Sequence, residues 1–418
     1  MSAIGEERLR ASTKWFAIAV IAGCLLRIIL VVTTIGTNDV VFNTMWARLI
    51  ERHGIAHAYA YNQDLNHPPL SLLIFSLMNR TSRLLHVRYT DVFRMVQSIA
   101  DVFSLFFIGA IARRLGRPSR EMALFFFLSP TAIAISAFHC NTDSTMVALT
   151  CLAVLLLIGD RPLWSGVVLA LAIGIKILPI FLLPFFLLQS RKKAAALAVG
   201  FGAALGLIFV PSIVIGGAPV VRNIFGYSAF AGKWGLPALL LVVEKAVATP
   251  RSTVLYVLAY LYATQGKFVI LAAVALLAIR FRRIVRERPD TRREAVATIS
   301  LVFLFVLSLA PGFGIQYLVW PLALLPFLLE WKEALLLNAV ISAYVFTTYT
   351  IWSKGFPWWY ANSIAAIPHK EWVIYLGFPT WWIIIWAAAR GYGQIFRRTG
   401  EAAEPGVDVS GDVAAPLR

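Results

Sequence analysis

Apolar runs long enough to cross a lipid bilayer follow one another along most of this chain. A bilayer core of about 30 Å needs about 20 helical residues, and helix tilt or pairing allows shorter runs. Of the 418 residues, 59% are hydrophobic and only 14% are charged, and the mean hydropathy is +0.76. No soluble domain could bury this much apolar surface, so the sequence predicts an all-α polytopic membrane protein.

About twelve transmembrane spans are predicted from these runs. The first is interpreted as a retained signal anchor, because no small-x-small cleavage site follows it. Together the spans form one membrane domain, residues 14 to 389. They cover residues 14 to 35, 91 to 111, 121 to 138, 142 to 158, 163 to 175, 177 to 190, 194 to 215, 266 to 281, 295 to 311, 316 to 330, 333 to 350 and 371 to 389.

Basic residues cluster in three loops, and this order of spans places all three on the side of both termini. The loops contain Arg113 to Arg120, Arg191 to Lys193 and Arg280 to Arg293. Basic loops resist translocation, so residues 1 to 13 and the tail from 390 to 418, largely disordered by its composition, are expected in the cytoplasm. The formal net charge of +17 then reflects membrane topology and not nucleic-acid binding. The compact loops and abundant Ala, Val and Arg favour a bacterial inner membrane.

Three long segments lie on the opposite, extracytoplasmic side: 36 to 90, 216 to 265 and 351 to 370. Each is too apolar for a solvated loop and too polar or proline-rich for a clean span. They are expected to form interfacial or re-entrant helices, with an interfacial helix from Leu70 to Met78 in the first loop. The alternative, a transmembrane span there, would place the cluster from Arg113 to Arg120 outside.

Two carboxylates leave the membrane on this outer side. Asp39 ends the run Ile35-Gly-Thr-Asn-Asp39 after the first span, and Asp143 ends the run His139-Cys-Asn-Thr-Asp143 after the third. Glycosyl transfer from a lipid-linked sugar suits such a site. A polyprenyl phosphate is a good leaving group that needs only positive charge, and one carboxylate suffices to deprotonate the acceptor hydroxyl.

Charged residues inside the spans are costly, so each needs a partner or a function. Arg94, Gln97 and Asp101 share one helix face at i, i+3 and i+7, and Arg27 lies in the first span. One interpretation is a structural ion pair of Arg27 or Arg94 with Asp101. The other is that an arginine of the outer leaflet grips a lipid phosphate.

Lys176 lies at the outer apex of two short spans, just before Pro179. The two half-length helices predict a cationic pocket at membrane depth, although an interfacial lysine that merely snorkels would give the same pattern. Gln316 and Tyr317 follow a flexible Pro-Gly-x-Gly turn that carries them to the surface of Asp39. Either residue could instead cap a helix end.

At these positions the chain resembles the GT-C superfamily of membrane glycosyltransferases over residues 14 to 389. Within it, the chain is similar to dolichyl-phosphate-glucose glucosyltransferases and to bacterial polyprenyl-phosphate-mannose mannosyltransferases. The matching features are an acidic residue after span one (Asp39), His67-Pro-Pro-Leu70, Phe138-His-Cys-Asn-Thr-Asp143, a lysine–proline apex (Lys176 to Pro179) and a Gln-Tyr-Leu start of a span (Gln316 to Leu318).

The resemblance implies an inverting enzyme that needs no cofactor, metal ion or nucleotide sugar, with Asp39 as the catalytic base. It would move a hexose or pentose, mannose or glucose favoured, from a polyprenyl-phosphate sugar to a glycolipid or glycan acceptor. The donor phosphate would be bound by Lys176 with Arg27 or Arg94. The expected sugar and acceptor contacts are Asn38, Asn66, His67, His139, Asn141, Asp143, Gln316 and Tyr317.

Two other classes of function are compatible with outer-face polar groups. A transporter or lipid flippase would also need intramembrane charges, but it normally shows internal repeats with paired broken helices, and the two halves show no such self-similarity. A non-catalytic assembly subunit is the other class, and it predicts that all of these polar residues tolerate alanine.

Overall fold

The computed structural model describes residues 3–226, 232–247 and 253–396, with side chains from residue 13 onward, and helices dominate all three stretches. In chain order the elements are α1 (Ala3–Thr33), β1 (Gly36–Thr37), α2 (Asp39–His53), α3 (Ile55–Tyr61), α4 (Pro69–Leu85), α5 (Tyr89–Arg114), α6 (Ser119–Phe127), α7 (Pro130–Ala134), the π-helix η1 (Ile135–His139), α8 (Asp143–Ile158), α9 (Pro162–Ile175), the 3-10 helix η2 (Leu178–Leu182), α10 (Leu183–Ser190), the 3-10 helix η3 (Arg191–Lys193), α11 (Ala194–Gly216), α12 (Ala218–Phe225), α13 (Gly235–Val247), α14 (Thr253–Glu287), α15 (Arg292–Leu309), the 3-10 helix η4 (Ile315–Val319), α16 (Leu325–Leu328), α17 (Trp331–Trp352), β2 (Tyr360–Ala361) and α18 (Trp372–Phe396).

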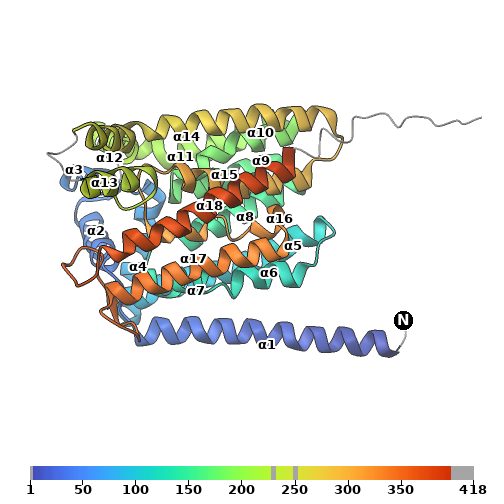
Figure 1. Ribbon diagram of the computed structural model, residues 1–418, viewed down its shortest axis with the longest axis horizontal. Helices are drawn as coiled ribbons and strands as arrows, with labels where there is room; N and C mark the ends of the chain where they lie inside the picture. Colours follow the sequence, from blue (N-terminus) through green and yellow to red (C-terminus); the bar gives the residue numbers. More distant parts are fainter. Residues whose placement is uncertain (1–2, 227–231, 248–252, 397–418) are drawn as a thin grey trace, which may run out of the picture.

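The long helices lie side by side with their axes in one general direction (Figure 1). The short helices α2, α3, α12 and α13 gather at one end of this bundle, and the two-residue strands β1 and β2 form a parallel pair. The first residues of α1 and the last turn of α18 lie at the opposite end. The prediction of an all-α membrane protein is confirmed, because strands account for only four residues among those that the structure describes.

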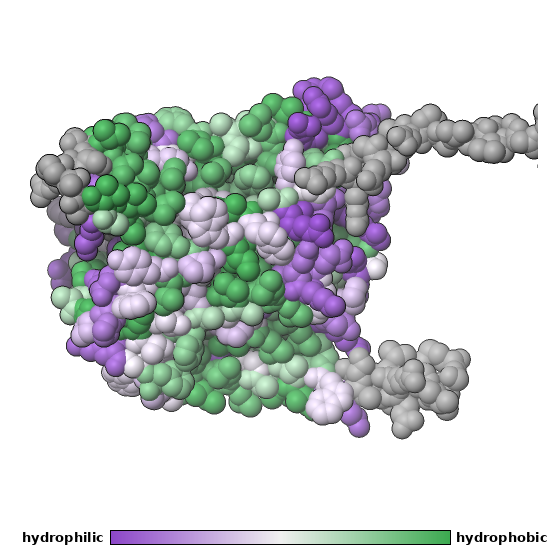
Figure 2. Space-filling model, in the orientation of Figure 1, coloured by the Kyte–Doolittle hydropathy of each residue, from purple (hydrophilic) through white to green (hydrophobic). Residues whose placement is uncertain are grey.

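Apolar side chains cover the outside of the bundle. Along α1, more than half of each of Ile18, Ile21, Leu25, Ile29 and Val32 is exposed. Hydrophobic residues cover the middle of the visible face, and hydrophilic residues gather toward its ends (Figure 2). Contiguous apolar surface of this extent needs a nonpolar surrounding, which a bilayer supplies.

Five helical stretches of the described chain are long and apolar enough to cross a membrane: Thr13–Thr33, Tyr89–Arg114, Leu178–Gly216, Trp331–Trp352 and Trp372–Phe396. A sixth results if α6 and the stretch Pro130–His139, which meet at a bend of 47°, form one span. Several other predicted spans coincide with shorter helices such as α8 and α9. The protein is therefore multi-pass, and the number twelve stays a prediction.

Two predicted boundaries differ from the structure. The span expected at 316 to 330 is two short helices, η4 and α16, joined by a turn, because Pro321 and Pro326 interrupt the helical hydrogen bonds. Leu318 and Leu322 are fully buried here, so the irregular backbone is enclosed by protein. The segment expected at 216 to 265 contains α12 and α13, but α14 begins at Thr253, well before the predicted span.

The three basic loops meet at the end of the bundle where α1 begins. Arg293 donates a hydrogen bond to the carbonyl oxygen of Leu115 at 3.0 Å, and Arg191 donates to the carbonyl oxygen of Arg288. Arg120, at the start of α6, contacts the hydroxyl of Thr13 in α1 at 2.9 Å. This gathering is what the predicted topology requires, and the cytoplasmic location of that end stays a prediction. The predicted disordered tail lies outside the described residues.

Candidate active site

Asp39 is the first residue of α2, and a small sheet holds the backbone before it. Gly36 pairs with Tyr360, and the backbone N–H of Asn38 donates to the carbonyl oxygen of Ala361 at 2.9 Å. A helix N-terminus carries partial positive charge, so a carboxylate is stabilised at this position. The sheet thus anchors the end of α1 and sets the direction in which Asp39 leaves it.

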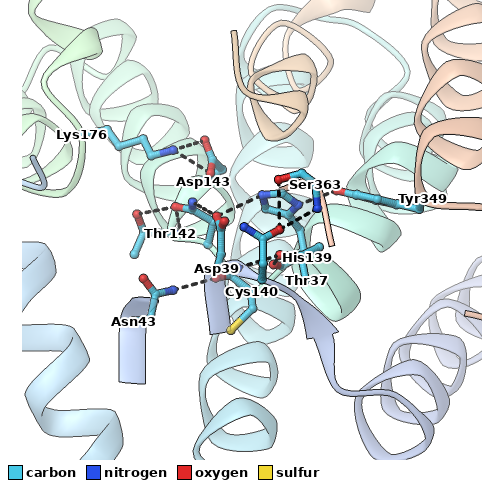
Figure 3. A network of polar contacts seen from close by, with 12 residues as sticks. Thr37, Asp39, Asn43, His139, Cys140, Thr142, Asp143, Lys176, Tyr349 and Ser363 are labelled. Atoms are coloured by element: carbon cyan, nitrogen blue, oxygen red, sulfur yellow. Dashed lines mark hydrogen bonds and ion pairs between the residues drawn. The ribbon is translucent and has the colours of Figure 1, made fainter. Parts of the chain in front are cut away.

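The turn between η1 and α8 lies against this anchor. Cys140 adopts a left-handed conformation with φ of 66°, which ends η1 and reverses the chain. Thr37 donates through its hydroxyl to the carbonyl oxygen of His139 at 2.5 Å, and Asn43 of α2 donates through Nδ2 to that of Cys140 at 2.8 Å. These bonds tie the turn to both sides of Asp39 (Figure 3).

Two side chains of this turn contact the Asp39 carboxylate. Nδ2 of Asn141 donates to Oδ2 at 2.7 Å, and Oδ1 of Asn141 accepts the N–H of Thr142, which sets the amide orientation. Nε2 of His139 lies 3.3 Å from the same Oδ2. On the other side of the ring, Nδ1 of His139 lies 2.7 Å from the hydroxyl of Tyr349 in α17. An ionised carboxylate only accepts hydrogen bonds, so the proton belongs on Nε2 and Tyr349 donates to Nδ1.

The surroundings keep Asp39 ionised although it is largely buried. Burial by itself would raise the pKa of the carboxyl, but the close contact with His139, the amide of Asn141 and the charge of Lys176 outweigh it. The pKa of Asp39 is therefore below its usual value of 3.8. The side chain is still 27% exposed, so a substrate can reach it.

Lys176 and Asp143 form a second, buried centre beside the first. The Lys176 ammonium lies 2.8 Å from each oxygen of Asp143, and Nε1 of Trp320 donates to Oδ1 at 2.7 Å. The ammonium also lies 4.9 Å from the centre of the Tyr317 ring, a cation–π distance. Asp143 begins α8, and Lys176 has an extended backbone just after α9. The predicted lysine apex is present as a break between α9 and η2.

His67 is held beside these centres as a neutral ring. It packs between Trp46 and Phe75, with ring centres 5.2 and 5.3 Å away. Burial, followed by the charge of Lys176, lowers the pKa of His67 to about 3. The neighbouring Asn66 is half-buried, and its amide makes no hydrogen bond to any residue in the described part of the chain.

Other residues predicted for sugar binding have separate surroundings. The side-chain oxygen of Asn38 is already bonded within the protein, because it accepts the N–H and the hydroxyl of Ser363 at 3.1 and 3.0 Å. Gln316 is half-buried in η4, and its amide has no hydrogen bond within the described stretches. Asn38 therefore stabilises the sheet region, whereas Gln316 keeps an uncommitted amide.

Arg27 is a structural residue in this fold. Its guanidinium is only 1% exposed and pairs with Asp101 at 2.9 Å. The remaining donors bond to the carbonyl oxygens of Gly23 and Phe127 and to the hydroxyl of Ser136. The structure favours the structural ion pair over the phosphate contact, because the side chain is almost wholly buried and each of its three nitrogens already donates to a protein oxygen.

Arg94 is buried as well, with no exposed surface. It donates to the carbonyl oxygens of Val31 and Thr34 and to Asp91 at 2.8 to 3.2 Å. A cation at a helix C-terminus stabilises the unpaired carbonyls, so Arg94 fastens the outer end of α1. Neither arginine is part of the phosphate site proposed below. Of the two predicted alternatives for the partner of Asp101, the structure has Arg27, while Arg94 pairs with Asp91.

Two contributors to the site have no sequence signal. Tyr349 lies in an apolar helix among other aromatic residues, and Trp320 lies in the broken segment after η4. Aromatic residues at such depths usually belong to the interfacial belt. Only the packing of α17 and η4 against the turn at His139 shows that their polar atoms complete the site.

The fold and the site define a multi-pass membrane protein whose outer helices enclose a carboxylate, a histidine and a lysine in a partly exposed polar centre. The family model described as glycosyltransferase family 87 matches residues 66–311, which is more than half of the chain. The chain belongs to this family. The family match confirms that it is a glycosyltransferase, and its long apolar helices confirm that it is a membrane protein.

Solved structures match this chain only at low similarity, and no curated protein matches the sequence. ArnT from Cupriavidus metallidurans in the apo state is 11% identical with a TM-score of 0.42, over 94% of this chain and 79% of that protein. The oligosaccharyltransferase of Archaeoglobus fulgidus in the apo form is 14% identical with a TM-score of 0.38, over 90% of this chain and 56% of that one.

Proposed function

We propose that this protein transfers a hexose or pentose, with mannose or glucose favoured, from a polyprenyl-phosphate sugar to a lipid-linked or glycan acceptor on the extracytoplasmic face. Family 87 supports glycosyl transfer, and the motifs from Asp39 to Gln316 that resemble polyprenyl-phosphate-dependent enzymes support the donor. The observation that carries the proposal is the ionised, partly exposed Asp39 held by His139 and Asn141.

Asp39 acts as the general base in this mechanism. The acceptor oxygen attacks the anomeric carbon from the face opposite the phosphate, while a carboxylate oxygen of Asp39 takes the hydroxyl proton. The bond between the anomeric carbon and the phosphate oxygen breaks, and polyprenyl phosphate leaves with the electron pair. One displacement inverts the configuration at the anomeric carbon.

Lys176 binds the leaving phosphate. An ammonium group has three N–H donors, and Asp143 accepts from it through both oxygens. The third donor can meet a phosphate oxygen, and it does so in a site with little water, where charge is weakly screened. Asp143 and Trp320 hold the lysine in place, so their role is to position the cation.

The polar groups that remain uncommitted are the best candidates for sugar hydroxyls. Asn66 and Gln316 are both half-buried with free amides within the described chain, and neutral His67 offers ring nitrogens. His139 and Asn141, which were predicted as sugar contacts, instead support the base through direct contacts to its carboxylate.

The test replaces Asp39 by asparagine, which keeps the shape and removes the proton acceptor. Transfer from a polyprenyl-phosphate sugar in membranes is expected to fall by about 100-fold or more, with expression and donor binding retained. Asp64→Asn is the matched control, since Asp64 is an exposed aspartate of the same outer segment. Full turnover by Asp39→Asn would reject the proposed base, and labelled-sugar flux into liposomes without a covalent product would indicate transport instead.

A further inference from the structure

Tyr360, a residue of β2, brings a hydroxyl to the neighbourhood of Asp39 that the mechanism above does not use. The side chain is half-buried, and its hydroxyl makes no hydrogen bond to any residue in the described part of the chain. Burial raises the pKa of the Tyr360 phenol, and the negative charge of Asp39 raises it further. Such an effect of charge indicates that the two groups are near neighbours.

The strand pair fixes the backbone of Tyr360 relative to the proposed base. The N–H of Ile35 donates to the carbonyl oxygen of Trp359 at 2.8 Å, and the N–H of Asn38 donates to that of Ala361 at 2.9 Å. The residues on both sides of Tyr360 are thus bonded to the segment that leads into α2. The neighbourhood of the phenol and the carboxylate is therefore a property of the fold and needs no bound ligand.

The ring of Trp358 anchors the same segment from the protein side. It is buried and packs against Phe138 and Tyr349, with ring centres 5.1 and 5.4 Å away. Its Nε1 donates to the hydroxyl of Thr350 at 3.0 Å. With the chain held on both sides, Tyr360 is preorganised, and a preorganised group binds a ligand with little loss of entropy.

The segment of Tyr360 lies on the side of Asp39 away from the proposed phosphate site. Lys176 and Ser363, which follows β2 by two residues, lie on opposite sides of Asp39, and Tyr349 lies on the side of Ser363 (Figure 3). In a single displacement the acceptor oxygen attacks from the face opposite the leaving phosphate. A free hydroxyl on this side therefore meets the acceptor and not the donor phosphate.

We propose that Tyr360 binds the acceptor, donating a hydrogen bond to the sugar hydroxyl next to the one that Asp39 deprotonates. This inference rests on the proposed glycosyl transfer and assigns the acceptor class, which is a sugar ring with a second hydroxyl beside the reacting one. The phenol keeps its proton across the neutral pH range, so it acts as a donor, while the ionised carboxylate of Asp39 acts as an acceptor. The two groups together match a pair of neighbouring hydroxyls.

The test measures sugar transfer by the full-length protein in phosphatidylcholine nanodiscs. The donors are polyprenyl-phosphate mannose and polyprenyl-phosphate glucose, and the acceptors are octyl mannoside and octyl glucoside. Tyr360→Phe removes one oxygen and breaks no hydrogen bond within the described protein. The acceptor KM should rise about three- to tenfold, the value of one hydrogen bond, while the donor KM stays unchanged. Tyr61→Phe is the matched control, because Tyr61 is an exposed tyrosine of α3.

A series of monodeoxy acceptors tests the contact itself. The wild-type protein should lose about the same factor in acceptor KM when the octyl glycoside lacks the hydroxyl next to the reacting one. Tyr360→Phe should lose nothing more with that acceptor, because the partner of the hydroxyl is already absent. Two changes that remove the same contact are not additive, whereas an aromatic residue that only anchors the protein in the membrane interface gives no such coupling.

Four results would overturn the assignment. They are an unchanged acceptor KM in Tyr360→Phe, a raised donor KM in its place, additive losses with every monodeoxy acceptor, and no transfer to either glycoside by protein that turns over in its native membrane. The activity of Asp39→Asn decides the proposed transfer separately. If that variant is inactive while Tyr360→Phe behaves as the wild-type protein, only the assignment of Tyr360 fails.

Discussion

Replacing His139 by phenylalanine tests whether this histidine keeps the proposed base ionised. Phenylalanine retains a ring in a site where His139 is only 4% exposed, but it removes the nitrogen 3.3 Å from Oδ2 of Asp39. Burial raises the pKa of Asp39 and the histidine is the foremost opposing influence. The pKa of Asp39 should therefore be higher in the variant than in the wild-type protein.

The size of the effect follows from the lost contact. A hydrogen bond to a charged group is worth about 1.5 to 3 kcal/mol, and about 1.4 kcal/mol is a factor of ten in protonation. The wild-type pKa lies below 3.8, so the base form persists as the pH falls through that value. In His139→Phe the carboxyl takes its proton at higher pH, and on the acid limb the ionised fraction should fall about tenfold or more.

The assay is kcat/KM for sugar transfer across the acidic and neutral pH range. The acid limb should move to higher pH in His139→Phe and by a smaller amount in Tyr349→Phe, which keeps the ring beside Asp39. His139→Phe leaves the buried Tyr349 hydroxyl unpaired, at a cost of about 1 to 3 kcal/mol in stability, and the double variant removes that cost. A folded His139→Phe protein with lower rates but an unmoved acid limb would refute the reasoning.

Three further substitutions test the remaining assignments. Asp143→Leu leaves Lys176 buried without its counter-ion, so the free energy of unfolding should fall by about 3 to 5 kcal/mol in a thermal melt, and adding Lys176→Met should recover stability but not transfer. Arg27→Met should cost a similar amount while the donor KM stays unchanged, and Arg27→Met/Asp101→Leu should recover most of it; a raised donor KM in that folded double variant would return Arg27 to the phosphate site. Gly36→Ala should lower kcat by roughly tenfold or more, because Gly36 has φ of 111° and a Cβ there would lie 2.7 Å from a carbonyl oxygen of η1. Turnover at the wild-type rate would show that the backbone before Asp39 can move without loss of activity.

The residues of the candidate site that sequence patterns located are those at the ends of predicted spans. Asp39, His139 and Lys176 each follow an apolar run, and hydropathy places such residues at the membrane surface without knowledge of the fold. Hydropathy does not show in which direction each of these side chains points. Asn38 is next to Asp39 in the chain, yet it bonds to Ser363, more than 300 residues away.

The sequence by itself determined that this chain lies in a membrane, that it is helical and that its motifs resemble those of membrane glycosyltransferases, because these properties add up from local stretches of residues. The tertiary structure alone decided the pairings: Arg27 with Asp101, Arg94 with Asp91, and His139 with Tyr349 across 210 positions of the chain. Pairing depends on how each helix is rotated and packed against its neighbours. No local pattern encodes that rotation, so the sequence left two interpretations of each arginine open, and the partners became visible only in the assembled helices.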